Sequence, residues 1–207
     1  MSDLTFTLVS DGPSDQALLP ALHWLLRRSS SRVFSGEWPD LRRLPRRIKG
    51  LNERIRVAVE LAPCDLLFVH RDAEGVPAAN RVSEITAALG SSGLSPVIPV
   101  VPVRMTEAWL VWHEPAIRRA AGNPRGSEPL ALPATHHVEA CSDPKALLRE
   151  ALRTASGLGR RRTERLRDVT ARIVADHIED FSPLLTLPSF SSLAREVAQV
   201  IARHGWA

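Results

Sequence analysis

Hydrophobic and polar positions follow two periods along the chain, and their order indicates the fold class. Residues 4–9 and 66–69 are short apolar runs with β-branched and aromatic side chains, which is typical of strands. Between them, apolar residues recur at helical spacing over residues 14–28 and again over residues 46–61. This alternation predicts a crossover connection that returns the chain to a parallel sheet.

The remaining segments extend this pattern. Residues 29–45 are irregular and predict at most a short edge strand, whereas residues 78–89 predict a helix. The apolar run 97–103 is broken by prolines, which places its strand near a sheet edge. Helices are expected from Thr106 to Ala121, from Pro144 with Asp143 as its cap, through the arginine-rich segment to about residue 178, and from Ser191 or Ser192 to His204.

These elements predict an α/β protein with a three-layer, Rossmann-like, mostly parallel sheet and a helical C-terminal extension. Gly122 and the Gly- and Pro-rich stretch after it suggest a boundary. We expect an α/β domain over residues 1–122 and a helical extension packed on it over residues 123–207.

Composition narrows the class. The chain has 207 residues, of which 44% are hydrophobic and 24% charged, so a folded core is expected. No apolar run approaches the roughly 20 residues that span a bilayer, and no signal peptide is expected. Cys64 and Cys141 are far apart without metal-binding spacing, which fits free thiols in a reducing cytoplasm.

The net charge is +4, and arginines are concentrated in two places. The clusters are Arg42, Arg43, Arg46, Arg47 and Lys49, and Arg160, Arg161, Arg162, Arg165 and Arg167. Guanidinium groups suit bidentate phosphate contacts, so a nucleic-acid partner is one interpretation. A solvated helix face is the other.

Acidic residues follow three of the predicted strands. Asp11 follows the first, Asp72 and Glu74 the second, and Glu107 the third. Each alone is commonly a cap or turn residue. Because ligands bind beyond the carboxyl ends of parallel strands, we expect Asp11 and Asp72 to meet there, with Asp11, Asp72 and Glu74 binding Mg²⁺.

His70 lies within this acidic stretch and leaves alternatives open. As a ligand it favours Mn²⁺ or another transition metal over Mg²⁺, and it could instead act as a general base or a structural hydrogen-bonding partner. Trp109 and Trp112 are expected in a helix core. The P-loop, dinucleotide-binding, serine-hydrolase and zincin motifs do not occur.

Four segments carry a family resemblance. They are Asp11 to Asp15, Phe68 to Gly75, Pro102 to Leu110, and Phe181 to Phe190. A strand followed by an acid and glycine, and later a strand followed by an acidic pair and glycine, resembles the TOPRIM domain of topoisomerases, primases and overcoming-lysogenization-defect nucleases. The chain is more closely similar to a TOPRIM-like family of unknown function, found in bacterial genomes and often associated with defence loci.

The resemblance implies phosphodiester chemistry. Asp11 matches the TOPRIM glutamate, and His70 and Asp72 match the two positions that hold Mg²⁺. Glu74 matches a further acid, and Glu107 matches the family's acid before Ala-Trp. Asp at position 11 and His at position 70 depart from the TOPRIM pattern.

We therefore expect a cytoplasmic metal-dependent nuclease, with a role in bacterial defence. Asp11, His70, Asp72 and Glu107 would be catalytic, with Mg²⁺ or Mn²⁺ as cofactor. The residues expected to contact phosphate are Arg46, Arg47, Arg71 and Arg104. The alternatives are an inactive TOPRIM-like module that binds nucleic acid or a partner ATPase, and a small-molecule phosphohydrolase.

Overall fold

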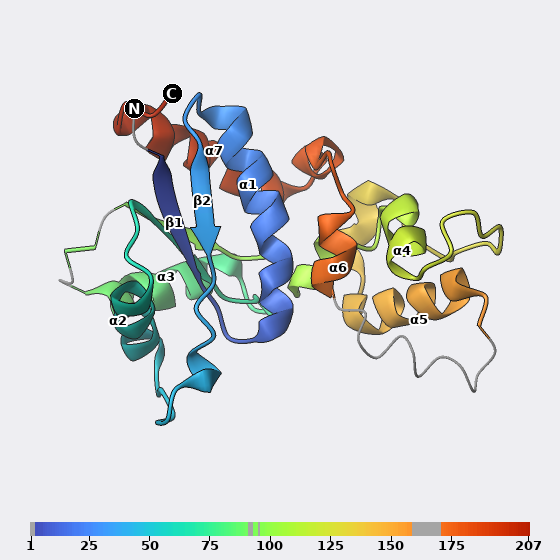
Figure 1. The fold of residues 1–207 in the computed structure, drawn as a ribbon, viewed down its shortest axis with the longest axis horizontal. Helices are drawn as coiled ribbons and strands as arrows, with labels where there is room; N and C mark the ends of the chain where they lie inside the picture. Colours follow the sequence, from blue (N-terminus) through green and yellow to red (C-terminus); the bar gives the residue numbers. More distant parts are fainter. Residues whose placement is uncertain (1–2, 91–92, 95, 159–170) are drawn as a thin grey trace.

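A four-stranded, all-parallel sheet organises the chain (Figure 1). The computed structural model describes residues 3–90, 93, 94, 96–158 and 171–207. The strands are β1 (Leu4–Val9), β2 (Phe34–Glu37), β3 (Leu66–His70) and β4 (Val97–Val100), in the order β2-β1-β3-β4. The predicted α/β class, the strands and the edge position of the proline-containing strand are confirmed.

Helices connect the strands and form most of the second half of the chain. The α-helices are α1 (Leu18–Ser29), α2 (Leu51–Leu61), α3 (Ala78–Leu89), α4 (Glu114–Ala120), α5 (Pro144–Ser156), α6 (Ala171–Asp176) and α7 (Pro188–Arg203). Short 3₁₀ helices are η1 (Pro13–Ala17), η2 (Leu41–Arg43), η3 (Thr106–Trp109), η4 (Thr135–Ala140) and η6 (Ser182–Thr186).

Strand alternation divides the core into two clusters, one on each face of the sheet. Leu8 and Phe68 belong to the larger cluster, where α1 and α7 pack. Val9 and Val69, each one residue later in its strand, belong to the smaller cluster with α2 and α3. The sheet therefore lies between two helical layers (Figure 1).

The outer edge at β4 carries a proline in the middle of the strand. The N–H groups of Leu67 and Arg71 donate to the carbonyls of Pro96 and Val100, at 3.0 and 3.1 Å. The even-numbered positions of β4 thus bond to β3, so the nitrogen of Pro99 faces outward. A proline is tolerated here because no ladder hydrogen bond is lost.

Some predicted helices were wrong in extent. The last one, α7, begins at Pro188 and not at Ser191 or Ser192, because proline is tolerated in the first turn of a helix. The helix predicted over residues 46–61 begins at Leu51, because Gly50 has a φ of +76° that interrupts helical geometry. The segment predicted as a helix from Thr106 consists of η3 followed by α4. Pro115 lies in the first turn of α4 and cannot continue a preceding helix, and the hydroxyl of Thr106 does not cap η3.

The C-terminal helices share the core of the sheet. Asp143 caps α5 as predicted, accepting from the N–H of Ala146 at 2.9 Å. Phe190 of α7 packs against the rings of Trp24 and Trp109, with centroids 6.4 and 5.0 Å away. Trp109 is 2% exposed, so the prediction that it lies in the core is confirmed. The larger cluster contains residues from both sides of residue 122, and the division there stays a prediction.

Three further expectations concern the cysteines, membrane-spanning helices and the second arginine cluster. Cys64 and Cys141 are free and half-buried. Within the part of the chain that the structure describes, no helix is long and apolar enough to cross a membrane. The second arginine cluster, Arg160 to Arg167, lies outside the described residues.

Candidate metal centre

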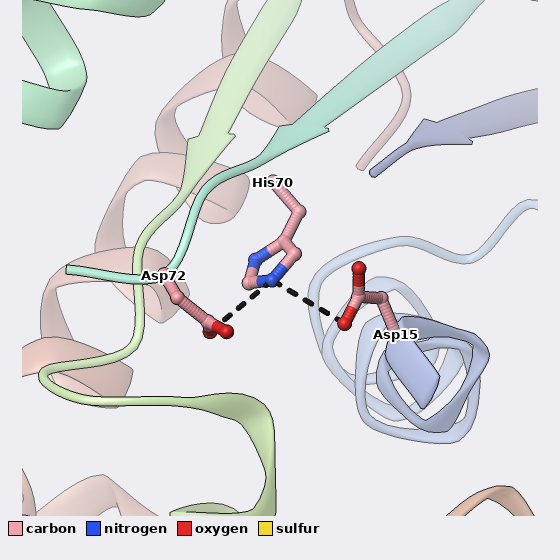
Figure 2. Close-up of side chains that lie close together, drawn as sticks. All are labelled: Asp15, His70 and Asp72. Atoms are coloured by element: carbon pink, nitrogen blue, oxygen red, sulfur yellow. Dashed lines mark ion pairs between the residues drawn. The ribbon is translucent and has the colours of Figure 1, made fainter. Parts of the chain in front are cut away.

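Three side chains converge just beyond the carboxyl ends of β1 and β3. Figure 2 shows the imidazole of His70 between the carboxylates of Asp15 and Asp72. Nε2 of His70 lies 3.3 Å from Oδ1 of Asp72 and 3.8 Å from Oδ1 of Asp15. One ligand atom from each residue lies within 4.8 Å of the others, a spacing that a single metal ion could bridge.

The end of β3 positions two of these residues. His70 is the last residue of the strand and follows Leu66 and Phe68 on the face covered by α1. Alternation continues beyond the strand end, so Asp72 joins His70 on that face. The backbone carbonyl of Asp72 accepts from Nε of Arg81 at 2.9 Å, which ties the turn to α3.

Asp15 reaches the centre from η1. Its Oδ2 accepts from the N–H of Gly12 at 2.9 Å, and its own N–H donates to the Gly12 carbonyl at 3.3 Å. This reciprocal pair fixes the carboxylate and leaves Oδ1 directed at His70. Asp15 was not among the residues predicted to bind metal or to be catalytic. Its signal is its position one turn after Asp11, at the start of the helical segment.

Hydrogen bonding determines the tautomer of His70. Nδ1 lies 2.9 Å from the carbonyl oxygen of Val100, which can only accept, so Nδ1 carries a proton and donates it. In the neutral ring, Nε2 then presents a lone pair toward the two carboxylates. A metal-binding histidine typically has this arrangement, with its second nitrogen donating to a carbonyl.

Burial makes this arrangement costly without a cation. His70 is 2% exposed, and Oδ1 of Asp72 is buried without a hydrogen-bonding partner among the described residues. Burial acts to lower the pKa of His70, but Asp72 and Asp15 outweigh it and the pKa is raised above 6.5. Either a proton on His70 or a metal ion therefore offsets the two carboxylates.

The donor set fits a divalent transition metal. Two carboxylates and one imidazole suit Mn²⁺ or a similar ion better than Mg²⁺, which prefers oxygen ligands. The unpartnered oxygen of Asp72 supplies a donor that the protein leaves unused. Asp15, His70 and Asp72 would hold such an ion.

Asp11 lies outside this group of three. β1 and β3 pair in a register that sets Val9 beside Val69, so two residues further on Asp11 lies beside Arg71. Its carboxylate forms ion pairs with Arg54 and Arg71. The structure thus brings Asp15, rather than Asp11, to Asp72, because alternation sends Asp11 to the opposite face of the sheet.

The other predicted acids occupy the surroundings. Glu74 has a φ of +52°, and its exposed carboxylate pairs with Arg81 at 3.1 Å, outside the group of three. Glu107 lies in η3 and is 6% exposed. The adjacent hydroxyl of Thr106 lies 3.5 Å from Nε2 of His70, so η3 borders the centre.

The predicted phosphate contacts lie in different places. Arg71 pairs with Asp11 and, at 3.0 Å, with Glu84. Arg46 pairs with Glu53, and Arg47 is exposed. Arg104 is half-buried, and its carbonyl accepts from the N–H of Glu74 at 3.2 Å. Their role in phosphate binding stays a prediction.

Glu107 provides a test by pH. Burial raises the pKa of its carboxyl above 4.5, Asp72 and Asp15 raise it further, and Lys145 and its own backbone amide offset part of this. The folded state therefore holds the proton more tightly than the unfolded state, so the carboxyl destabilises the fold increasingly as pH rises above about 4.5. Glu107→Gln should stabilise the protein at pH 8, and the gain should vanish near pH 4.

Urea unfolding in EDTA at the two pH values measures this difference. Glu60→Gln is the control, because Glu60 is exposed on α2 and pairs only with Arg56 among the described residues. Equal effects of Glu107→Gln at both pH values would contradict the expectation.

Comparison of the chain with protein-family models, with curated proteins and with solved structures found no match. The likeness to TOPRIM domains therefore stays a prediction from sequence.

Proposed function

We propose that the protein is a metal-dependent phosphodiester hydrolase, specifically a nuclease that uses Mn²⁺ or Mg²⁺. The supporting observation is the convergence of Asp15, His70 and Asp72 at the carboxyl edge of a parallel sheet. A buried imidazole and two carboxylates do not contribute to hydrophobic packing there. This edge of the sheet is also where α/β proteins bind ligands. A cytoplasmic location and a role in bacterial defence belong to the same proposal.

Each residue has a defined task in this reaction. Asp15 and Asp72 offer carboxylate oxygens, and Val100 keeps Nε2 of His70 unprotonated toward them when the ring is neutral. A divalent ion there would orient a water molecule and stabilise charge on the phosphoryl group. Glu107, whose pKa is raised by burial, is the side chain beside the centre suited to hold or release a proton.

Hydrolysis assays with and without metal test this function. We expect cleavage of bis(p-nitrophenyl) phosphate and of single-stranded DNA or RNA with Mn²⁺, and no cleavage in EDTA. Restoration by added Mn²⁺ distinguishes metal removal from denaturation. Hydrolysis confined to phosphomonoesters and short nucleotides would instead indicate a small-molecule phosphohydrolase. Absence of hydrolysis with every divalent metal would reject the proposal.

One observation favours an inactive binding module as the second candidate. The raised pKa of His70 means that a protonated ring can neutralise Asp15 and Asp72 without metal. Such a module would bind nucleic acid or a partner ATPase through its basic surface. This candidate would be supported if the protein binds nucleic acid in EDTA and does not cleave it after Mn²⁺ is added.

A further inference from the structure

A basic cleft lies around Asp11, on the opposite face of the sheet from the metal centre. One hollow of about 400 Å³ extends beside η2, and a second of about 540 Å³ adjoins it near the start of α2. Arg47, Ile48 and Arg54 line both hollows, so the two are neighbours, and we refer to them together as the basic cleft. Its volume lies in the range of small-molecule sites.

The cleft carries an excess of positive charge. Its cations are Arg42, Arg46, Arg47, Lys49, Arg54 and Arg71, and its acids are Asp11, Asp40 and Glu84. Asp40 is already held by Arg42, whose side chain lowers the pKa of that carboxyl to about 2. Arg47 and Lys49 form no ion pair with any described residue, so both remain available to an anion.

Two arginines of the cleft hold the carboxylate of Asp11. Its carboxylate lies between the guanidinium groups of Arg54 and Arg71, and Nη2 of Arg54 also lies 3.4 Å from its carbonyl oxygen. Nε of Arg71 is buried and without a partner among the described residues. Paired guanidinium groups recognise carboxylate and phosphate oxygens alike, and a phosphate would offer them more charge.

Apolar side chains form another part of the same cleft. Trp38 lines it together with Leu44 and Ile48. Nε1 of Trp38 donates to Oγ of Ser10 at 2.8 Å, which fixes the indole beside the residue that precedes Asp11. A fixed indole in a hollow that Arg54 also lines suits a ligand that joins a planar ring to a phosphate.

We propose that this cleft binds a nucleoside phosphate whose phosphate group replaces the carboxylate of Asp11 between Arg54 and Arg71. Arg71 lies between His70 and Asp72 in sequence but points to the opposite face, so the site is separate from the metal centre and goes beyond the proposed function. Asp11 acts as an internal competitor that occupies the arginine pair in the free protein. The ligand is a free nucleotide or the phosphorylated end of a strand.

Calorimetry in EDTA tests the site without any metal chemistry. We expect AMP to bind at least about tenfold more tightly than adenosine or inorganic phosphate, because each of these lacks one half of the ligand. A 5′-phosphorylated oligonucleotide is compared with the same strand carrying a 5′-hydroxyl. Preference for that phosphorylated strand over AMP assigns the strand end, and the reverse assigns the free nucleotide.

Opposite effects of two substitutions distinguish the site from a general basic surface. Arg54→Gln should weaken AMP binding about tenfold, whereas Asp11→Asn should tighten it several-fold by removing the competitor. Arg56→Gln is the matched control on α2, since Arg56 pairs with Glu60 and lines neither hollow. Arg47→Gln disturbs no described ion pair and should also weaken binding, so it replaces Arg54→Gln if that variant does not fold.

Several outcomes would overturn the inference. One is that AMP does not bind at millimolar concentration. Another is that inorganic polyphosphate binds, per phosphate group, as tightly as AMP. A third is that Asp11→Asn binds AMP more weakly than the original protein does. The Asp72→Asn variant should keep its affinity for AMP in EDTA. The nucleotide site and the proposed hydrolase can therefore fail independently.

Discussion

Replacing Asp72 by asparagine is expected to reduce Mn²⁺-dependent phosphodiester hydrolysis by about 100-fold or more. Residues that only support a metal ligand already contribute about 10- to 100-fold to affinity or activity, and Asp72 would be a ligand itself. Asparagine preserves the shape of the side chain but removes the charge beside His70. Initial rates at several Mn²⁺ concentrations separate weaker metal binding from a slower reaction.

The same variant should lose stabilisation by metal. A ligand that binds only the folded state adds about 2.7 kcal/mol at a concentration 100 times its Kd, so Mn²⁺ should raise the melting temperature of the original protein and not of the variant. Asp3→Asn is the matched control, because Asp3 is exposed at the other end of β1. Full activity in Asp72→Asn would remove the assignment of the metal centre.

Replacing Phe190 by alanine is expected to lower the free energy of unfolding by about 3–5 kcal/mol. Phe190 is fully buried and contacts Trp24 of α1 and Trp109 of η3. The cavity would lie where α7 packs against α1, in the layer that covers the sheet. Urea unfolding followed by tryptophan fluorescence and by circular dichroism measures the change.

The two probes should report one coincident transition, because the C-terminal helices and the sheet share a core. Gln199→Ala is the control, since Gln199 is exposed on the same helix and its loss should change stability by less than about 0.5 kcal/mol. Separate transitions for the sheet and the C-terminal helices would support an independently folding unit over residues 123–207.

Strands and fold class were predictable from sequence because each strand is a short apolar run bounded by polar or breaking residues. β1 was predicted with its observed bounds, and the prolines correctly placed β4 at an edge. Helix extents were less predictable. Gly50 and Pro115 interrupt apolar patterns that would otherwise continue as helices, and backbone geometry decided both cases.

The location of the candidate site at the edge of the sheet was predictable, but the face of the sheet on which each acidic residue lies was not. Acids at the ends of neighbouring strands correctly pointed to one edge of the sheet, where His70 and Asp72 lie close together. Whether Asp11 or Asp15 approaches them depends on the register of β1 against β3, which involves pairing between distant segments. That register sets Asp11 beside Arg71, and no local pattern in the sequence reveals it.

The proline in β4 has a consequence for self-association. With the nitrogen of Pro99 facing outward, a further chain that docks along this edge would find no hydrogen donor at the middle of the strand. Edge-to-edge polymerisation, the first step toward fibrils, is therefore disfavoured on this side. Substituting Pro99 with valine would restore the donor at this position.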